Sequence, residues 1–301
     1  MQMQQTLKHS YSFEGKGLHT GRVAKMTINP APADTGIRFR RTDIGEDAIV
    51  DALAEFVSNT ARSTTIANGE VSVATIEHVL SALTGMGVDN ALIDIDNIEV
   101  PILDGSAKPY IDAIWADGFQ QQDSPRRYIE GKKTIEIRNE EKGSLVRIEP
   151  AEEFSYDIMV DFNSRVLGVQ HALWNPSVTY AEEIGVCRTF VFFHEIEFLF
   201  NNGLVKGGDV DNAIVIVEHP VTDEQVNRMS QLFNIPALSV REDGYLSNLT
   251  LRFPNECARH KLLDLIGDLR LCGGFLKAKV TAEKAGHGIN TNAAKAVRAQ
   301  L

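Results

Sequence analysis

The sequence is poor in cysteine, with three among 301 residues. Cys187, Cys257 and Cys272 are odd in number, and no two of them form a C-x-x-C pair. This spacing excludes a disulfide framework and a zinc or redox motif built on closely spaced cysteines. Free thiols are typical of proteins in a reducing compartment, so we expect a cytoplasmic protein.

Long apolar runs and an excess of positive charge are missing too. No stretch reaches membrane-spanning length, and the opening residues 1–5 lack the charged and apolar regions of a secretion signal. The net charge of -11 argues against general binding to nucleic acid or to anionic membranes, so a phosphorylated ligand would need a local cluster of Lys and Arg. Hydrophobic residues make up 43% of the chain, enough for the cores of about two domains.

Hydrophobic periodicity predicts an α+β protein of two similar halves. Alternation indicates strands within residues 5–43, 89–96 and 154–162, and Asn68-Gly69 predicts a hairpin turn. Thr75 is a plausible cap for a first helix, and residues 260–271 predict a second. Each helix carries a His, is followed by glycines and then by a strand. We interpret this echo as two related domains, each a mainly antiparallel sheet with helices, whose helices face each other.

Other segments refine the expected organisation. A helix with Ile111, Ile114 and Trp115 on one face is expected after residue 106, and a last helix is expected over 291–298. Residues 120–127 break all periodicity, so we predict a linker there, between an N-terminal domain (1–125) and a C-terminal domain (126–301).

An aromatic insertion at about 186–218 is expected within the C-terminal domain. Such an aromatic run is by default buried core, and the alternative is the lining of an apolar tunnel. Gly207 and Gly208, directly after the run, would leave room for a tunnel, so Gly208 is a candidate substrate contact.

One helix face carries the candidate chemistry. His260, Asp264 and Asp268 lie four residues apart and therefore share a face. Such a stripe is more often solvated, but an imidazole and a carboxylate one turn apart can reach a single ion about 2.0–2.2 Å away. If the two helices meet, His78 joins His260 and Asp264 and leaves an open coordination position, as in catalytic zinc sites. Glu77, next to His78, would then act as general base on the water.

Amide hydrolysis also needs a partner for the oxyanion and a proton for the leaving group. His287, which is flanked by glycines, and the Thr189 hydroxyl are the candidates, with Asp268 orienting His287. Two His and one carboxylate also suit non-haem iron, so the ligands alone leave an oxygenase open. Glu77 and His287 favour hydrolysis. His19, in a glycine-flanked loop, is interpreted as a hydrogen-bonded turn residue outside the site.

Several segments, in this order, resemble the zinc-dependent UDP-3-O-acyl-N-acetylglucosamine deacetylases of lipid A biosynthesis. They are Gly-Lys-Gly-Leu-His-Thr-Gly (15–21), Thr-Ile-Glu-His (75–78), Val-Pro-Ile-Leu-Asp-Gly-Ser-Ala (100–107), Cys-Arg-Thr-Phe (187–190), His-Lys-Leu-Leu-Asp-Leu-Ile-Gly-Asp (260–268) and Gly-His (286–287). The resemblance covers nearly the whole chain. It implies helices sandwiched between two sheets, one zinc ion per chain at the domain junction, with Fe²⁺ open as the metal in the cell, and hydrolysis of the 2-acetamido group of a UDP-linked, 3-O-(3-hydroxyacyl)ated glucosamine.

The resemblance also implies roles at the matching positions. The implied zinc ligands are His78, His260 and Asp264. The implied catalytic residues are Glu77 as general base, His287 as general acid, Thr189 as oxyanion donor, Asp268 as the residue that orients His287, and Lys261 near the phosphates and the developing charge. The implied substrate contacts are Phe190 and Phe192 along the acyl chain, and Phe162 and Lys284 around the nucleotide.

Two further features follow from the resemblance. Arg62 stands where many family members carry an apolar residue near the acyl passage. The sequence is also similar to members fused to a C-terminal 3-hydroxyacyl carrier-protein dehydratase, which leaves open a covalent partner of that kind. A catalytically silent lipid- or nucleotide-binding module is the alternative from another class, and it is disfavoured because every chemical position holds a competent residue.

Overall fold

Two sheets with the same strand order form the outer layers of the protein. The computed structural model describes residues 2–201, 206–209, 211–232 and 238–301. The first sheet has the order β2-β3-β9-β4-β5, and the second has the order β12-β13-β18-β14-β15, with β11 (Tyr128–Glu130) also paired to β18. In each sheet the last strand in sequence enters the centre, antiparallel to one neighbour and parallel to the other. The predicted echo between the two halves is therefore confirmed as one topology used twice.

The bounds of the strands follow the predicted alternation. The first sheet comprises β2 (Tyr11–Lys16), β3 (Val23–Pro30), β4 (Ile37–Arg41), β5 (Ile49–Asp51) and β9 (Ala91–Ile95). The second comprises β12 (Ile135–Asn139), β13 (Ser144–Pro150), β14 (Ser155–Asp161), β15 (Val169–Trp174) and β18 (Phe275–Glu283). Side chains of β4, β9 and β18 that face inward are buried and those that face outward are more exposed, as expected for sheets covered on one face.

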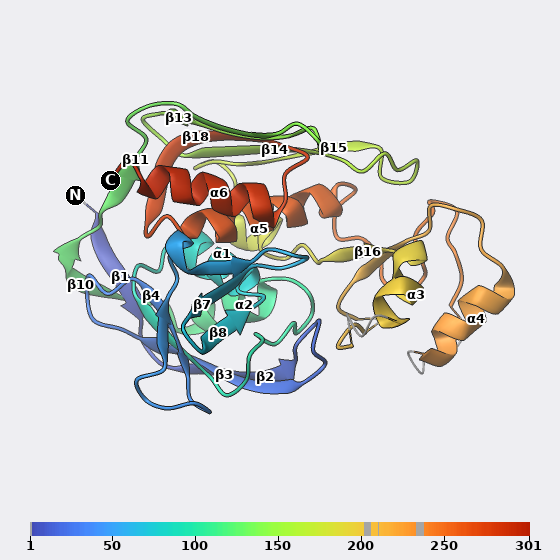
Figure 1. Ribbon diagram of the computed structural model, residues 1–301, viewed down its shortest axis with the longest axis horizontal. Coiled ribbons are helices and arrows are strands. Elements are labelled where there is room, and N and C mark those ends of the chain that lie inside the picture. The colour runs from blue at the N-terminus through green and yellow to red at the C-terminus, as the bar shows by residue number, and fades with distance from the viewer. Residues whose placement is uncertain (1, 202–205, 210, 233–237) are drawn as a thin grey trace.

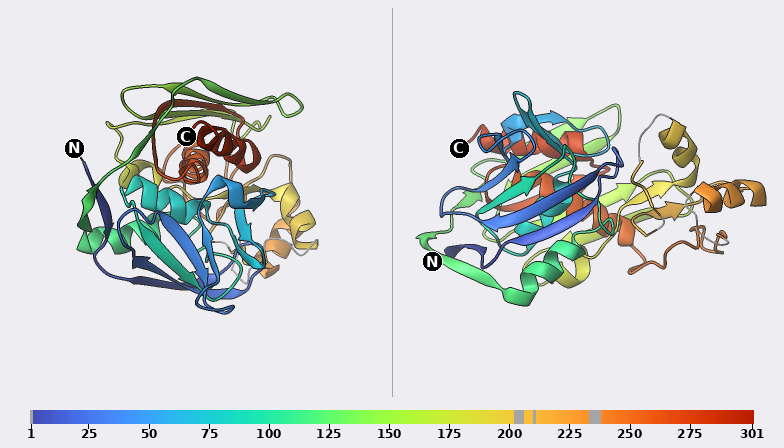
Figure 2. Two further views of the ribbon diagram at one scale, coloured as in Figure 1. Left: turned by 60° about the vertical axis from the view of Figure 1, so that its left-hand side comes forward. Right: turned by 90° about the horizontal axis from the view of Figure 1, so that it is seen from below.

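The helices outside the second insertion lie between the two sheets, as Figure 1 and the left view of Figure 2 show. They are α1 (Glu77–Gly85), α2 (Lys108–Asp117), α5 (Glu256–Arg270) and α6 (His287–Arg298). Leu80 and Leu83 of α1 and Leu262 and Ile266 of α5 are fully buried in the main core. The expected α+β architecture, with helices sandwiched between two sheets, is confirmed.

Each unit carries an insertion between its fourth sheet strand and a helix of the central layer, which is α1 in the first unit and α5 in the second. In the first unit the insertion is a small sheet of β6 (Val57–Asn59), β7 (Thr65–Asn68) and β8 (Val71–Ala74). In the second it contains β16 (Phe190–Phe192), α3 (Phe193–Asn201), β17 (Ile214–Ile216) and α4 (Asp223–Leu232). Helices α3 and α4 project to the right of the body in Figure 1. Phe193, Val215 and Val226 belong to a small core of this second insertion.

Some local predictions are wrong. The expected linker is largely strand β10 (Phe119–Pro125), which pairs antiparallel with β1 (Met3–Leu7); its glutamines hid the strand because alternation of apolar residues is absent there. Trp115 is 61% exposed instead of buried with Ile111 and Ile114. The boundary between residues 125 and 126 stays a prediction.

Two predicted helix starts also differ from the structure. Thr75 does not cap α1: it adopts a left-handed backbone with φ 60°, and its hydroxyl donates to Glu99 Oε1 at 3.0 Å. The last helix begins at His287, four residues earlier than expected, because Gly286 and Gly288 masked its start. Among the described residues, no helix has the length and apolar character to cross a membrane.

The close crossing of α1 and α5 yields a stability prediction. A Cβ at Gly267 would lie 2.0 Å from the backbone oxygen of Glu77, so Gly267→Ala must push the two helices apart. We expect the free energy of unfolding to fall by about 1–3 kcal/mol. Denaturant unfolding measures this, with Gly131→Ala as control, where a Cβ would meet only contacts of 3.8 Å or longer. Equal stability of the two variants would contradict the prediction.

Candidate active site

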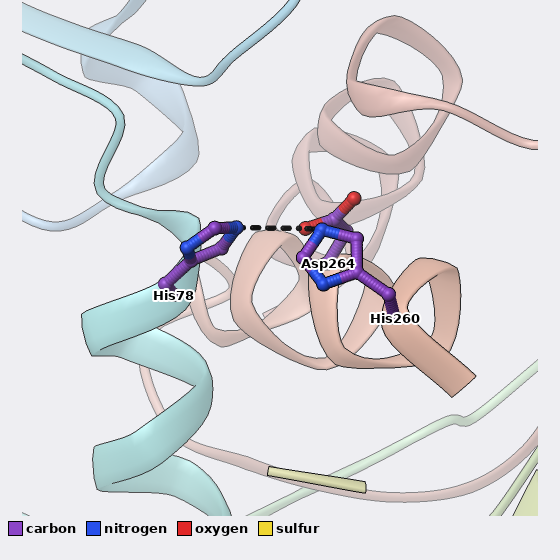
Figure 3. A group of neighbouring side chains, drawn as sticks. All are labelled: His78, His260 and Asp264. Carbon is purple, nitrogen blue, oxygen red and sulfur yellow. Dashed lines mark ion pairs between the residues drawn. The ribbon is translucent and has the colours of Figure 1, made fainter. Parts of the chain in front are cut away.

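Three potential metal ligands converge where α1 meets α5. His78 lies in the first turn of α1, and His260 and Asp264 lie one turn apart on α5, so packing of the two helices brings them together. Nε2 of each imidazole is 3.5 Å from Asp264 Oδ1, and the two rings are 5.0 Å apart in an edge-on arrangement. Figure 3 shows the three side chains pointing toward one point. All three are buried, and their ligand atoms lie within 4.8 Å of one another.

The donor atoms fit a metal ion. Asp264 Oδ1 is buried and has no hydrogen-bond partner in the part of the chain that the structure describes, which is costly unless a cation meets it. Burial lowers the pKa of His260 to about 3, so its imidazole is neutral. His260 Nδ1 donates to the Cys187 carbonyl at 3.0 Å, which leaves Nε2 as an acceptor. Burial alone would raise the pKa of Asp264, but Lys261 and the neighbouring imidazoles outweigh it and lower the pKa well below its usual value.

Lys261 is a partner of the ligand group. Its Nζ donates to Asp264 Oδ2 at 2.8 Å, and it lies 5.6 Å from the centre of the Phe190 ring. Burial would lower the pKa of Lys261, but Asp264 outweighs burial and raises it. Lys261 is therefore a cation that holds the Asp264 carboxylate with Oδ1 turned to the imidazoles.

Glu77 is a buried carboxylate beside the ligand group. Its Oε2 accepts a hydrogen bond of 3.0 Å from the backbone N–H of Thr64, and its Oε1 is 4.0 Å from His287 Nε2. Burial raises the pKa of Glu77, while the nearby His287 opposes that shift. A fixed carboxylate with a raised pKa has the properties of a general base.

His287 is held as a cation by carboxylates. Its Nδ1 donates to Asp268 Oδ2 at 2.9 Å, and the same oxygen accepts a bond of 2.9 Å from Asn290. Burial would lower the pKa of His287, but Asp268 and Glu77 outweigh it and raise the pKa to about 9. His287 lies at the start of α6, where the helix dipole disfavours a cation. The negative charge of Asp268 is therefore needed to offset the dipole as well as burial. The imidazolium Nε2–H is thus a proton donor at neutral pH.

Thr64 is a site residue that the sequence reasoning missed. Its hydroxyl donates to Asp268 Oδ1 at 2.5 Å, while its backbone N–H holds Glu77. One residue therefore links the carboxylate beside the candidate metal ligands to the carboxylate that is bonded to His287. Only its place before a predicted hairpin marked it in the sequence, and that does not reveal contacts to residues 13 and 204 positions away.

His19 lies closer to the site than its interpretation as a turn residue implied. Its backbone N–H does donate to Glu99 Oε1 at 2.9 Å, as expected of a turn. Its Nε2, however, is buried without a hydrogen-bond partner among the described residues. Burial lowers the pKa of His19; Glu99 opposes this shift, whereas Arg62 and His287 add to it. The charge on His287 is thus one of the influences that lower the pKa of His19.

The aromatic residues form a wall that starts at the ligand group. The Phe190 ring lies 6.4 Å from that of His260 and 5.4 Å from that of Phe162, which is 5.9 Å from Phe192. Phe162 and Phe192 also line a cavity of about 570 Å³ together with Glu195 and other residues. Phe193 faces the opposite way, into the core of the insertion. The run thus contains buried core and a half-exposed aromatic face.

The remaining candidates lie around this wall. Lys284 Nζ is 2.8 Å from Asp161 Oδ2, next in sequence to Phe162. Thr189 directly precedes β16, and its backbone N–H donates to the Gly105 carbonyl at 2.8 Å. Gly208 follows Gly207, whose N–H donates to the Leu18 carbonyl, so it lies near the loop of His19.

The fold and the site define a two-unit α+β protein in which a buried group of three potential metal ligands lies next to a carboxylate and an imidazole that approach each other. The family model for UDP-3-O-acyl N-acetylglycosamine deacetylase matches residues 4–234 and 234–299. The chain belongs to this family. Membership implies a catalytic metal, and His78, His260 and Asp264 are the residues that fit one.

Relatives from several bacteria match over nearly the whole chain. The Bifunctional enzyme LpxC/FabZ of Porphyromonas gingivalis is 42% identical over 301 residues, which are 100% of this chain and 65% of that protein. The protein of the same name from Bacteroides thetaiotaomicron is 40% identical with the same coverage. The UDP-3-O-acyl-N-acetylglucosamine deacetylase of Teredinibacter turnerae is 39% identical over 290 residues, 95% of this chain and 87% of that protein. The chain thus spans slightly less than two thirds of the bifunctional relatives.

The raised pKa of His287 yields a prediction. In the metal-free protein we expect the His287 ring to titrate near pH 9. Asp268→Asn should lower that pKa, because it removes the negative charge that contributes most to raising it against the effect of burial. A pKa above its unfolded value stabilises the fold below about pH 6.5, and this contribution is lost as the pH rises toward 9. NMR titration of the ring measures the shift.

The control for this titration is Asp112→Asn on α2, which removes an acid from an ion pair with Lys108. It should leave the His287 titration unchanged. A pKa of His287 that is the same in Asp268→Asn and in the unaltered protein would contradict the assignment of Asp268 as the group that keeps the ring charged.

Proposed function

We propose that this protein is a zinc-dependent hydrolase of the cytoplasm. It removes acetate from the 2-acetamido group of UDP-3-O-(3-hydroxyacyl)-N-acetylglucosamine, the committed step of lipid A biosynthesis. The observation that carries the proposal is the meeting of the ligand group with Glu77 and His287 at one buried point, in a chain of this family. An oxygenase using the same ligands has no need of that acid–base pair.

His78, His260 and Asp264 would hold one zinc ion and leave a coordination position open. When bound, zinc supplies a Lewis acid for the amide carbonyl and lowers the pKa of a water molecule toward about 7. Fe²⁺ in the cell fits the same donor set. Lys261 keeps the Asp264 carboxylate ionised and oriented.

The residues of the chain would move two protons. Glu77, fixed by the N–H of Thr64, accepts a proton from the attacking water. His287, charged and oriented by Asp268, stabilises the developing negative charge and protonates the leaving amine. Thr189 is the proposed further donor to the oxyanion. Glu77 Oε1 and His287 Nε2 are 4.0 Å apart. Both groups could therefore act at the same amide carbonyl, Glu77 on the attacking water and His287 on the leaving nitrogen.

The surroundings suit a substrate with an alkyl chain and a diphosphate. Phe190 and Phe192 offer an apolar face that leads from His260 to the cavity. Phe162, half-exposed, offers a ring for the nucleotide, and the neighbouring Lys284 offers a cation. Gly208, near the loop of His19, is proposed as a further substrate contact. In an acidic chain, Lys261 and Lys284 would supply the local positive potential.

The bifunctional relatives suggest a partner. Their name joins two enzymes, and this chain matches 65% of their length. We propose a fused 3-hydroxyacyl carrier-protein dehydratase as a covalent partner of the deacetylase unit in the full-length protein.

Metal binding is tested by His78→Gln. Removal of one of three ligands should lower zinc affinity severely, so the dialysed variant should retain little zinc while the unaltered protein retains one ion per chain. Elemental analysis gives the metal content. His171→Gln, at an exposed position of β15, is the control. Full zinc occupancy in His78→Gln would refute the proposed ligand set.

Catalysis is tested by Glu77→Ala and His287→Ala. Both variants should keep zinc and lose about 100- to 10,000-fold in turnover, the usual contribution of general acid–base groups. Acetate release from the zinc-loaded protein and the UDP-sugar, with oxygen excluded, is the measurement. Glu70→Ala, in the exposed turn between β7 and β8, is the control.

The same assay separates the alternatives. Near-normal rates in both variants would count heavily against the mechanism. Activity of the unaltered protein that requires oxygen would favour the oxygenase. Binding of the UDP-sugar without turnover would favour the silent binding module.

A further inference from the structure

A second cavity lies at the far end of α1 from the ligand group. Its volume is about 360 Å³, within the range of small-molecule sites. His78 lies in the first turn of α1, whereas Thr84 and Gly85, in its last turn, line this cavity. Seven residues of helix correspond to about 10 Å. Strand β11, which contributes Tyr128, lies on the side of the molecule away from α3 and α4 (Figure 1). The second cavity is therefore separate from the candidate active site and its aromatic wall.

Aromatic rings dominate the lining of the second cavity. The Trp174 ring is 4.5 Å from that of Phe154, 5.4 Å from that of Tyr156 and 5.6 Å from that of Tyr180. These four rings therefore form one continuous group. The complete set of aromatic residues in the lining is Tyr128, Phe154, Tyr156, Trp174, Tyr180 and Phe275. Because aromatic rings pack well against one another, such a lining favours an occupant that is itself a flat ring.

Two polar groups of the ring cluster lack a partner. Tyr156 and Trp174 are only 3% and 8% exposed, and both line the second cavity. Among the described residues, neither the Tyr156 hydroxyl nor the Trp174 indole N–H has a hydrogen-bond partner. Tyr180 differs from them, because its hydroxyl is bonded to that of Ser81 at 2.7 Å. Since buried Tyr and Trp side chains usually find a partner for these groups, the two free donors indicate an occupant with hydrogen-bond acceptors.

The charge of the lining has one sign. Its described residues include Arg126 and Lys277 but no Asp or Glu, in a chain whose net charge is -11. Arg126 is held by Asp89 at 2.7 Å. Lys277 pairs with Glu130 at 3.4 Å and with Glu152 at 3.8 Å, two carboxylates that are exposed by 67% or more. Exposed pairs of this kind are weak, so an anion in the cavity can take their place at Lys277.

We propose that the second cavity is a binding site for a planar aromatic compound that carries an anionic group. The ring of the ligand lies against the aromatic cluster, its acceptors receive hydrogen bonds from Tyr156 and Trp174, and its anionic group pairs with Lys277. A nucleoside monophosphate and an aromatic carboxylic acid share this chemistry. Binding here requires neither a metal ion nor turnover, so it is independent of the proposed function.

Calorimetric titration tests the chemistry of the ligand with two couples of compounds. One couple is GMP and guanosine, and the other is 4-hydroxybenzoate and 4-hydroxybenzamide; the first member of each is anionic and the second is neutral. At least one anion should bind with a Kd below about 1 mM, and about fivefold more tightly than its neutral analogue. The couple that shows this preference identifies the source of the ligand. Binding of neither anion, or equal binding of each anion and its neutral analogue, overturns the inference.

Two variants test whether the ligand lies in this cavity. Tyr156→Phe removes a hydrogen-bond donor and Lys277→Gln removes the cation, and each should weaken binding about fivefold. Lys277→Gln changes a partly exposed residue, so it tests the site even if Tyr156→Phe lowers stability. The matched control is Lys279→Gln, which removes the same charge two residues further along β18. Lys279 is 58% exposed, pairs with Glu149 and is not part of the lining.

A second control concerns the candidate active site. Lys284→Gln changes the proposed nucleotide contact there and should leave the affinity for the anionic ligand unchanged. Loss of binding in Lys284→Gln, or equal weakening by Lys277→Gln and Lys279→Gln, would place the ligand outside the second cavity and overturn the inference.

Trp174 supplies a direct signal of occupancy. The chain has two tryptophans, so Trp115→Phe leaves Trp174 as the only one. Trp115 is 61% exposed, and its replacement should leave the core intact. A ligand ring in the cavity contacts the Trp174 indole and should change its fluorescence with the same Kd that calorimetry gives. Heat of binding without a change in Trp174 fluorescence would contradict the proposed site.

Discussion

The close contact between α1 and α5 is the constraint on which the site depends. Gly267 lets the backbone of Glu77 approach α5, because any side chain there would overlap the Glu77 carbonyl. That approach places His78 opposite His260 and Asp264 and carries Glu77 toward His287. The three candidate ligands come from two repeated units, so neither unit alone holds the complete group. The packing of α1 against α5 thus both buries apolar side chains and positions the polar side chains of the candidate site.

Two networks of opposite charge divide the buried polar groups. Lys261 pairs with Asp264, while His287 pairs with Asp268 and faces Glu77. In the first network Lys261 lowers the pKa of the buried Asp264, and in the second Asp268 and Glu77 raise the pKa of the buried His287. Thr64 connects Glu77 to Asp268 by two hydrogen bonds. Because Thr64 belongs to the first insertion, that small sheet sets the geometry of the second network.

Much of the fold could be predicted from the hydrophobic periodicity of the sequence. The helices of His78 and His260 were predictable since apolar residues recur at helical spacing, and glycines mark the end of the first. The repeat was predictable as helix followed by strand, but the shared strand order was not, because the pairing of β18 between β13 and β14 is a long-range event. Strand β10 was misread since polar edge strands lack the pattern that reveals buried ones.

At the site, sequence spacing predicted that the His260 and Asp264 side chains share one face of a helix. It did not predict which groups lie next to them. The Cys187 carbonyl that fixes the His260 tautomer and the Thr64 N–H that holds Glu77 are backbone groups, which every residue possesses and no sequence pattern marks. The same holds for His19: no sequence pattern shows that its Nε2 is buried and lacks a hydrogen-bond partner among the residues that the structure describes. Sequence spacing therefore predicts which functional side chains share one face of a helix. It does not predict which backbone groups orient those side chains, because these contacts form only when distant segments pack together.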